Sequence, residues 1–255
     1  MSYGIQELMA VAMARSFVDG EVVVMGAVPG LPLAACRLAK ATHAPNLSYI
    51  VGGSGTVNPE PEALPRSSCD PALSAAPCTL PLPEVVLLEG RGDALDVFCA
   101  GGLQIDAFGN CNLIAVGSWE RPTLRGPGTV GLPFLPATRR SVLYTAAHTP
   151  RTMVERVDFV SGPGHPAHAG EDRPYRGTGP SLVVTPLATL DFDPESHRMR
   201  IASVHPGVTE SAVRTATGFD LLAGPPPAET PPPTEEELAE LRRIDPEGLL
   251  SEEED

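Results

Sequence analysis

The chain has 255 residues, of which 42% are hydrophobic, and this apolar content is enough for one sizeable core or two small ones. Its formal net charge of −14 argues against nucleic acid and anionic membranes as partners. No apolar run reaches the roughly 18 residues of a membrane-spanning helix, and the first residues lack the basic and apolar segments of a secretory signal, so neither is expected.

Cysteine usage predicts a cytoplasmic protein. The 5 cysteines are an odd number, widely spaced and without a CxxC pair, which favours reduced thiols over a disulfide framework or a zinc site. His165, His168 and His205 show no metal-ligand spacing either, so we expect no metal.

The first half of the chain alternates strands, glycine-rich turns and helices. Helical spacing and runs of β-branched residues predict the elements. The predicted helices are 3–18 and 33–41, and the predicted strands are 21–26, 47–51 and 96–100. Pro32 is well placed in the first turn of the second helix. Residues 57–83 are expected to be irregular, and a short apolar element covers 83–89.

The second half is richer in strands. The predicted elements are a short strand at 113–118, strands at 141–147, 181–185, 189–192 and 199–203, and a helix at 209–217. Two segments are predicted to be loops: the glycine-rich 125–131, and 165–180, which holds His165, His168, Arg173 and Arg176.

The last 31 residues differ in composition from the rest. Proline runs after Gly224 predict an extended linker, and Thr234-Glu235-Glu236-Glu237 is a capping box that opens a helix ending near Arg243. From residue 234 onwards 10 acidic residues stand against 2 arginines, a net of −8. We expect a domain over 1–224, followed by a linker, a short helix and a solvated acidic tail over 225–255.

This alternation predicts an α/β fold with an open, mainly parallel sheet flanked by helices. Ligands of such sheets bind beyond the carboxyl ends of the strands, and glycine clusters fall there at 26–30, 52–55 and 101–102. The strand–loop–helix unit at 22–40 is of a kind that binds anions, but it matches neither GxGxxG nor the Walker A pattern, so a nucleotide site is not favoured.

The most informative stretch is 98–112, where a short apolar run ends in Gly101-Gly102 and continues into Leu103 and Gln104. Glycines directly after a strand let the backbone approach a ligand closely. Backbone N–H groups there, with the Gln104 amide, can hold a developing oxyanion. The alternative interpretation is a buried strand followed by a turn.

Together these stretches resemble the B subunit of family I coenzyme A-transferases, particularly the glutaconate CoA-transferase type. The resemblance runs in order over nearly the whole chain. The matching segments are VVVMGAVPGLPLAACRLAK (22–40), YIVGGSG (49–55), LPRS (64–67), GGLQIDAFGNCN (101–112), HTPRTMVERVDFVSGPG (148–164), PSLVVT (180–185), RMRIASVHPGVTESAVRTATGFDL (198–221) and IDPEG (244–248). It implies obligate pairing with a homologous A subunit, commonly as an α2β2 assembly, with the active site at the A–B interface.

One position departs from the family. In the transferases, the strand ending near residue 51 is followed by a Glu that attacks the acyl-CoA thioester and carries CoA covalently. Here that segment reads Gly52-Gly53-Ser54-Gly55. Glu60 and Glu62 follow in a proline-rich loop and are poor substitutes. A carboxylate nucleophile is therefore absent from the expected place.

The departure resembles the family's cofactor-free decarboxylating branch. That resemblance implies conversion of 3-methylglutaconyl-CoA to 3,3-dimethylacrylyl-CoA, through a dienolate whose thioester oxygen is stabilised by Gly102 and Gln104. It implies no cofactor beyond the CoA that the substrate carries. Three alternatives stay open: a ring-opening β-ketoacyl-CoA hydrolase with a Glu from the A subunit, a CoA-transferase, and a non-catalytic subunit that only closes the A subunit's site.

The remaining site expectations concern binding. The residues expected to bind substrate are Gly52, Gly53, Ser54, Thr56, Gly101 and Leu103. Those expected to hold the CoA moiety are Gly26, Gly30, Gly126 and Gly128. Small uncharged residues at 52–56 would make the pocket less polar and so favour loss of a charged carboxylate. For Thr56 a turn-stabilising role is equally expected.

Five further side chains have simpler expectations. Cys99 is expected to be a small buried hydrophobe, whereas Cys111 either approaches the site or is buried. Asp106 is expected to anchor the Gly109-Asn110 turn rather than act as a base. His148 and Arg151 are expected to be a solvated loop pair, with contact to CoA phosphates or the partner subunit as the alternative.

Overall fold

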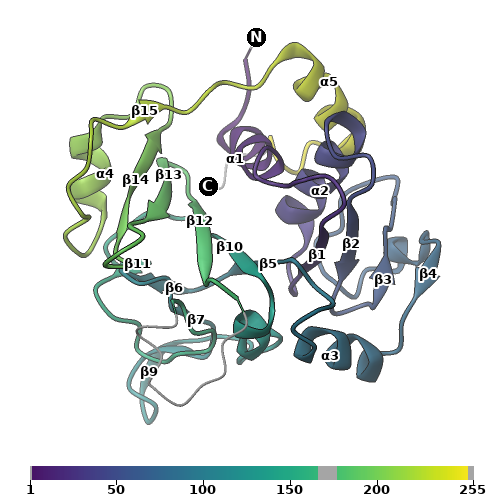
Figure 1. The fold of residues 1–255 in the computed structure, drawn as a ribbon, viewed down its shortest axis with the longest axis horizontal. Helices are drawn as coiled ribbons and strands as arrows, with labels where there is room; N and C mark the ends of the chain where they lie inside the picture. The colour runs from purple at the N-terminus through teal and green to yellow at the C-terminus, as the bar shows by residue number, and fades with distance from the viewer. Residues whose placement is uncertain (1, 166–176, 252–255) are drawn as a thin grey trace. The chain divides into compact units, whose positions relative to one another are not determined.

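The computed structural model describes residues 2–165 and 177–251, and the chain divides into two compact units. Unit 1 is formed by Met1–Cys99 together with Pro232–Asp255, and unit 2 by Ala100–Pro231 (Figure 1). The predicted class, an α/β fold with a mainly parallel sheet flanked by helices, is confirmed. Each unit is described by itself below.

Unit 1 alternates helices and strands in its first half, as predicted. Its elements are α1 (Ile5–Ala14), β1 (Val22–Met25), α2 (Gly30–Thr42), β2 (Ser48–Val51), β3 (Thr56–Val57), a 3₁₀ turn (Pro71–Ser74), β4 (Cys78–Thr79), α3 (Leu82–Gly90), β5 (Val97–Gly101) and α5 (Glu235–Ile244). The boundary with unit 2 falls within β5.

The strands of unit 1 follow the order β5-β1-β2-β3-β4. β1 lies parallel to both β5 and β2, and the short β3 and β4 continue the sheet in antiparallel fashion. In the parallel register Met25 pairs with Cys99 on one side and with Val51 on the other. The carboxyl ends of these strands therefore meet at one edge of the sheet.

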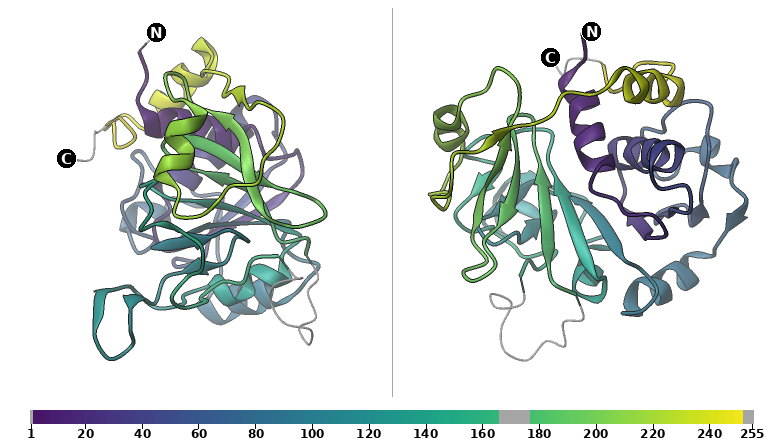
Figure 2. Two further views of the ribbon diagram at one scale, coloured as in Figure 1. Left: turned by 90° about the vertical axis from the view of Figure 1, so that its left-hand side faces the viewer. Right: turned by 45° about the horizontal axis from the view of Figure 1, so that its top comes forward.

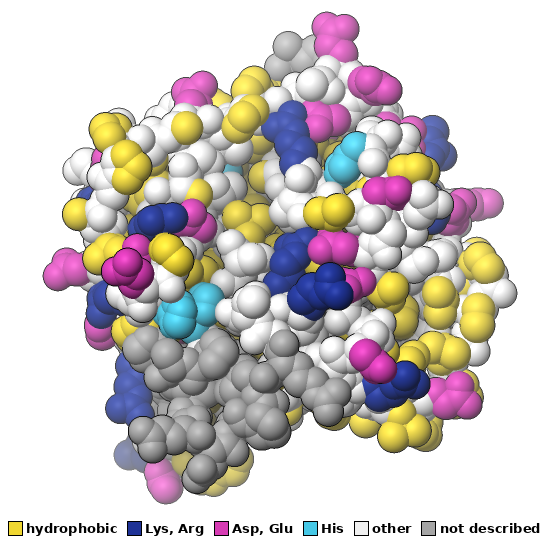
Figure 3. Space-filling model, in the orientation of Figure 1, with side chains coloured by type: hydrophobic (Ala, Val, Ile, Leu, Met, Phe, Trp, Pro, Cys, Tyr) yellow, Lys and Arg dark blue, Asp and Glu magenta, His cyan; other side chains and the backbone are white. Residues whose placement is uncertain are grey.

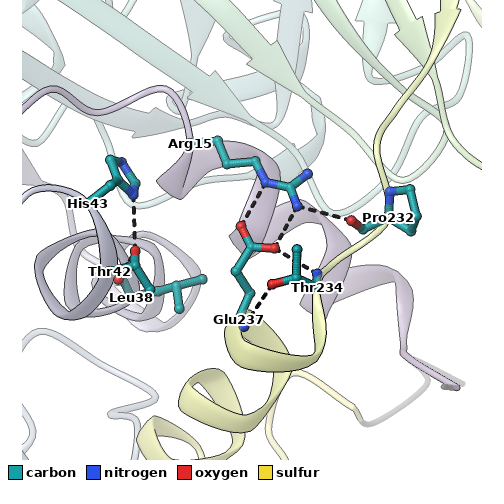
Figure 4. Close-up of polar contacts among 7 residues, drawn as sticks. All are labelled: Arg15, Leu38, Thr42, His43, Pro232, Thr234 and Glu237. Carbon is teal, nitrogen blue, oxygen red and sulfur yellow. Dashed lines mark hydrogen bonds and ion pairs between the residues drawn. The ribbon is translucent and has the colours of Figure 1, made fainter.

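Helices α1, α2 and α5 pack together in unit 1 (Figure 2). The apolar face of α5 is buried through Leu238, Leu241 and Ile244. Figure 4 shows how the first turn of α5 is tied to α1: the Arg15 guanidinium donates to both carboxylate oxygens of Glu237, at 2.8 and 2.6 Å. Thr234 caps the same turn by accepting from the Glu237 N–H, so the predicted capping box is confirmed.

Two helix boundaries differ from the prediction. The first helix spans Ile5–Ala14 rather than 3–18, because the chain leaves the helix in a turn after Arg15. The second begins at Gly30, three residues earlier than predicted, which places Pro32 within its first turn, where its missing N–H costs no helical bond.

Unit 2 consists mainly of strands. Its elements are β6 (Gln104–Asp106), β7 (Cys111–Asn112), β8 (Ala115–Gly117), β9 (Pro122–Arg125), a 3₁₀ helix (Leu132–Ala137), β10 (Arg140–Tyr144), β11 (Met153–Val154), β12 (Pro180–Val184), β13 (Ala188–Phe192), β14 (Met199–Val204), α4 (Glu210–Ala216) and β15 (Ala228–Glu229). The strands follow the order β15-β14-β13-β12-β10, with a second sheet β11-β6-β7 and a hairpin β8-β9.

Two segments that were predicted to be irregular differ from the prediction or lie partly outside the described residues. Residues 225–233 do not form only an extended linker, because Ala228 and Glu229 pair with Ser203 and Val204 as β15. Of the predicted loop at 165–180, residues 166–176, with His168, Arg173 and Arg176, lie outside the described residues. Within the described ranges, no helix has the length and apolar character needed to cross a membrane.

Candidate functional site

The strand-end glycines of unit 1 lie next to each other. The Gly52 N–H donates to the Met25 carbonyl at 3.0 Å, which holds the chain leaving β2 beside the chain leaving β1. Gly26 and Gly52 are half-buried and Gly53 is exposed. A Cβ at Gly26 would meet nothing within 4 Å, so its backbone faces open space. The structure thus brings together Gly26, Gly52 and Gly53, as expected from the parallel register.

The hydroxyls after β2 bond to each other. Ser54 Oγ lies 2.8 Å from Thr56 Oγ1 and 3.3 Å from the Val51 carbonyl, and Thr56 is buried. This arrangement stabilises the β2–β3 turn. Gly55 completes that turn with a φ of +71°, which a residue with a side chain adopts only under strain.

Gly30 and the glycine loop before α2 differ in exposure. Gly30 is buried, and a Cβ there would lie 3.4 Å from Leu249 and 3.5 Å from the Pro65 carbonyl. Val28, two residues before it, is exposed. The part of this loop that a ligand can reach is therefore the segment before Gly30.

In unit 2 the Gln104 amide belongs to a buried network. Gln104 is only 5% exposed. Its Nε2 donates to Asp158 at 3.1 Å, and its Oε1 accepts from the Asn112 amide at 2.8 Å and from the Asp158 N–H at 3.1 Å. One N–H of the amide is left for a ligand, since Nε2 carries two.

The neighbours of Gln104 place the other expected residues of unit 2. The Leu103 N–H donates to Asn112, whereas the Gly102 N–H makes no hydrogen bond with any described residue. A Cβ at Gly126 would lie 2.9 Å from Leu103 Cδ1, so the glycine-rich loop passes directly over that side chain. Gly128 has a φ of +100° and open space around it. Gly101, Gly102 and Leu103 are half-buried.

Asp106 anchors the turn at Gly109, as predicted. Its carboxylate accepts from the backbone N–H groups of Phe108 and Asn110, both at 3.0 Å, and from the Asn110 amide. The pKa of Asp106 is raised because its desolvation outweighs these bonds. Gly109 has a φ of +77°, and the bonds to Asp106 hold this turn in place.

Three further expectations can be compared with the structure. Cys99 is fully buried, as predicted, and so is Cys111, whose thiol pKa is raised by burial.

For His148 the expectation of a solvated loop pair is wrong. Its ring is buried and bonds Thr185 at 2.8 Å and Thr217 at 2.9 Å, which satisfies both nitrogens and permits burial. Desolvation lowers its pKa to about 4. Arg151 is exposed.

Sequence reasoning missed Glu89. This residue of α3 is 6% exposed, and its Oε1 lies 3.2 Å from where a Cβ of Gly52 would be. Burial raises its pKa to about 7. A signal was present in the sequence, because Glu89 follows Val85 by four residues and so shares a helix face with an apolar side chain. Glu60 and Glu62, which the sequence did draw attention to, are exposed.

Comparisons with known proteins show which family the chain belongs to. The coenzyme A transferase family matches residues 6–216. The chain is 32% identical to the B subunit of 3-oxoadipate CoA-transferase from Pseudomonas knackmussii over 248 residues, covering 96% of this chain and 94% of that protein. It is also 32% identical to the cholesterol ring-cleaving hydrolase IpdB subunit of Rhodococcus jostii over 248 residues, covering 95% and 93%.

Solved structures show the same fold. Glutaconate coenzyme A-transferase from Acidaminococcus fermentans matches with a TM-score of 0.87 at 29% identity, covering 99% of both chains. The decarboxylase AibA/AibB matches with a TM-score of 0.83 at 25% identity, covering 98% of both. The curated relatives are B subunits of two-subunit enzymes, which supports an A-subunit partner. The chain belongs to the coenzyme A transferase family.

Proposed function

We propose that this chain is the B subunit of a cofactor-free decarboxylase that converts 3-methylglutaconyl-CoA to 3,3-dimethylacrylyl-CoA. The observation that carries the proposal is the end of β2, where Gly52, Gly53 and Ser54 follow Val51 and this segment has no carboxylate that could attack a thioester. Ser54 is itself bonded to Thr56. Decarboxylation needs no enzyme nucleophile, because the leaving electron pair is accepted by the thioester of the substrate.

The reaction places negative charge on the thioester oxygen. When the C–C bond breaks and CO2 leaves, its electron pair forms a dienolate that extends onto this oxygen. We assign its stabilisation to the Gly102 N–H and the remaining N–H of Gln104. Each such donor contributes about 3 kcal/mol to transition-state stabilisation. Gln104 is held for this task by Asn112 and Asp158, which fix the plane of its amide.

Binding of the substrate is assigned to the glycine-rich segments. We assign the acyl group to Gly52, Gly53, Ser54, Thr56, Gly101 and Leu103, and the CoA moiety to Gly26, Gly126 and Gly128. Gly30 is buried and is left out of this assignment. We further propose that the enzyme is an α2β2 assembly with a homologous A subunit and that it acts in the cytoplasm. None of the 5 cysteines, all of which lie in the described part of the chain, forms a disulfide, which suits a reducing compartment.

The products of one incubation test the reaction. The complex of this chain with its A subunit is mixed with 3-methylglutaconyl-CoA, with and without acetate. Release of CO2 with CoA still esterified supports decarboxylation. Free CoA would instead support hydrolysis, and acyl exchange with acetate would support transfer, in keeping with the relatives that carry those names. If none of the three occurs, the proposal is wrong.

Gln104→Ala tests whether this chain takes part in the chemistry. We expect the rate of decarboxylation to fall by about 10²-fold or more. Because the variant also opens the buried network, Asn112→Ala is compared with it: this change removes the bond to Gln104 Oε1 but keeps the Nε2 donor, so the rate should fall less than in Gln104→Ala. Unchanged turnover in Gln104→Ala would show that the chain only closes the A subunit's site.

A further inference from the structure

Helix α3 of unit 1 buries a carboxyl together with one apolar side chain, while its leucines are exposed. Its buried residues are Val85 and Glu89. Leu82 and Leu87 are 61% and 67% exposed, and Figure 3 shows hydrophobic side chains gathered on the surface over α3 and β4. An amphipathic helix normally buries its apolar side chains and exposes its charged ones. Burial of Glu89 therefore costs free energy that the helix could avoid, and this calls for an explanation.

The carboxyl fills a space that a residue with a side chain at position 52 would take. The point where a Cβ of Gly52 would stand is 3.2 Å from Glu89 Oε1, 3.1 Å from the Met25 carbonyl and 3.8 Å from Val24 Cγ2. Contacts this close mean that a side chain at position 52 would have to push the Glu89 carboxylate and the Met25 carbonyl back by a few tenths of an ångström. Gly52 and Glu89 are therefore complementary, and the carboxyl end of β2 does carry a carboxyl, supplied by α3.

This carboxyl has no compensating partner. Among the described residues none donates a hydrogen bond to Glu89 or pairs with it as a cation. Apart from Glu89 Oε1, the atoms nearest the Cβ position of Gly52 are the Met25 carbonyl oxygen and a methyl group of Val24, and neither titrates. Desolvation alone raises its pKa to about 7, so near neutral pH the group exists in both the acid and the carboxylate form.

We infer that Glu89 is the acid that protonates the dienolate formed at the carboxyl end of β2. This step rests on the proposed function. The bond between the methylene carbon and the departing carboxylate breaks, CO2 leaves, and the electron pair enters the dienolate. The Glu89 carboxyl then gives its proton to that carbon, which becomes a methyl group. Glu89 is left as a carboxylate and recovers a proton from water, so each turnover consumes one proton.

The buried position of the Glu89 carboxyl suits a proton donor. An acid works best when its pKa lies near the working pH, because it then both holds a proton and gives it up readily. A surface glutamate would be deprotonated at neutral pH. Burial without a cation beside it is the simplest way to keep this proton available, and α3 provides that burial next to a glycine that leaves space for it.

Glu89→Gln in the complex tests the inference. Decarboxylation should fall by about 10²-fold or more, and the loss of rate that the unaltered complex shows above about pH 7 should vanish from the kcat profile. The matched control is Glu84→Gln, an exposed glutamate of the same helix, which should keep both the rate and the profile. A Glu89→Gln complex with the full rate and an unchanged profile overturns the inference.

A second measurement separates this inference from the proposed function. Infrared difference spectra of the complex carrying ¹³C-carboxyl glutamate, with and without Glu89→Gln, report the titration of Glu89 without substrate. A titration near 7 without CO2 release from 3-methylglutaconyl-CoA would show that Glu89 holds its proton at neutral pH but that the proposed reaction, and with it the protonation of this dienolate, is wrong. A titration in the ordinary glutamate range overturns the acid. A CoA thioester trapped on the Glu89 carboxyl would also overturn the inference, because it would show that Glu89 is a nucleophile and not a proton donor.

Discussion

Gly55 and Gly20 show at the scale of single residues what a glycine contributes. Both have a positive φ, of +71° and +84°. Gly20 has open space around its α-carbon, whereas a Cβ on Gly55 would overlap the Leu80 carbonyl oxygen and come within 3.4 Å of Val85. The two positions share the same backbone conformation but differ in steric surroundings.

Alanine at each position should separate these two effects. We expect Gly20→Ala to lower the free energy of unfolding by about 1–2 kcal/mol, the cost of a left-handed conformation. Gly55→Ala should cost about 1–3 kcal/mol more, because the carbonyl of Leu80 must also move. Urea unfolding of both variants checks this, and equal losses would show that the turn relaxes freely.

The charge of Glu89 should appear in the stability of the protein. Its folded-state pKa, about 7, exceeds the ordinary value of 4.5, so its contribution is complete below about pH 4.5 and is lost as the pH rises through 7. Glu89→Gln should therefore match the unaltered protein at pH 4 and exceed it at pH 8 by up to about 3 kcal/mol. Unfolding by urea at both values measures the difference, and Glu84→Gln should show none of it.

At the scale of elements, α5 completes the helical layer of unit 1. Its buried face consists of Leu238, Leu241 and Ile244, and the ion pairs Arg15–Glu237 and Arg242–Glu7 tie it to α1. Arg242 is half exposed, so that pair adds little, and burial of the apolar face supplies most of the attachment.

Leu241→Ala tests this attachment. Leu241 is almost completely buried, and its truncation should cost about 2–5 kcal/mol. Amide exchange in α1 and α2, which α5 contacts, should become faster. Glu236→Ala, on the exposed side of α5, is the control and should leave exchange unchanged. If both variants exchange alike, α5 does not hold this layer.

The same elements show what the sequence can and cannot predict. Periodicity and β-branching predicted α2, β1 and β2 closely, because these are regular elements with a buried face. The burial of His148 escaped prediction, since its two threonine partners lie 37 and 69 residues further along the chain. Glu89 escaped because the neighbouring Leu82 and Leu87 made α3 read as an ordinary apolar element. Residues far along the chain decide both cases, the two threonines for His148 and Gly52 for Glu89, although the spacing of Glu89 and Val85 gave a local signal.

At the scale of the whole molecule, the division of the chain into two units determines which unit is synthesised completely first. Unit 2 is one continuous segment, whereas unit 1 needs residues 1–99 and also the segment that begins at Pro232. A ribosome that has joined the first 231 residues has therefore made everything unit 2 requires, while the first helices still lack α5. Unit 1 can be completed only after unit 2 has been made. A nascent chain therefore cannot complete unit 1 before the segment that carries α5 has emerged.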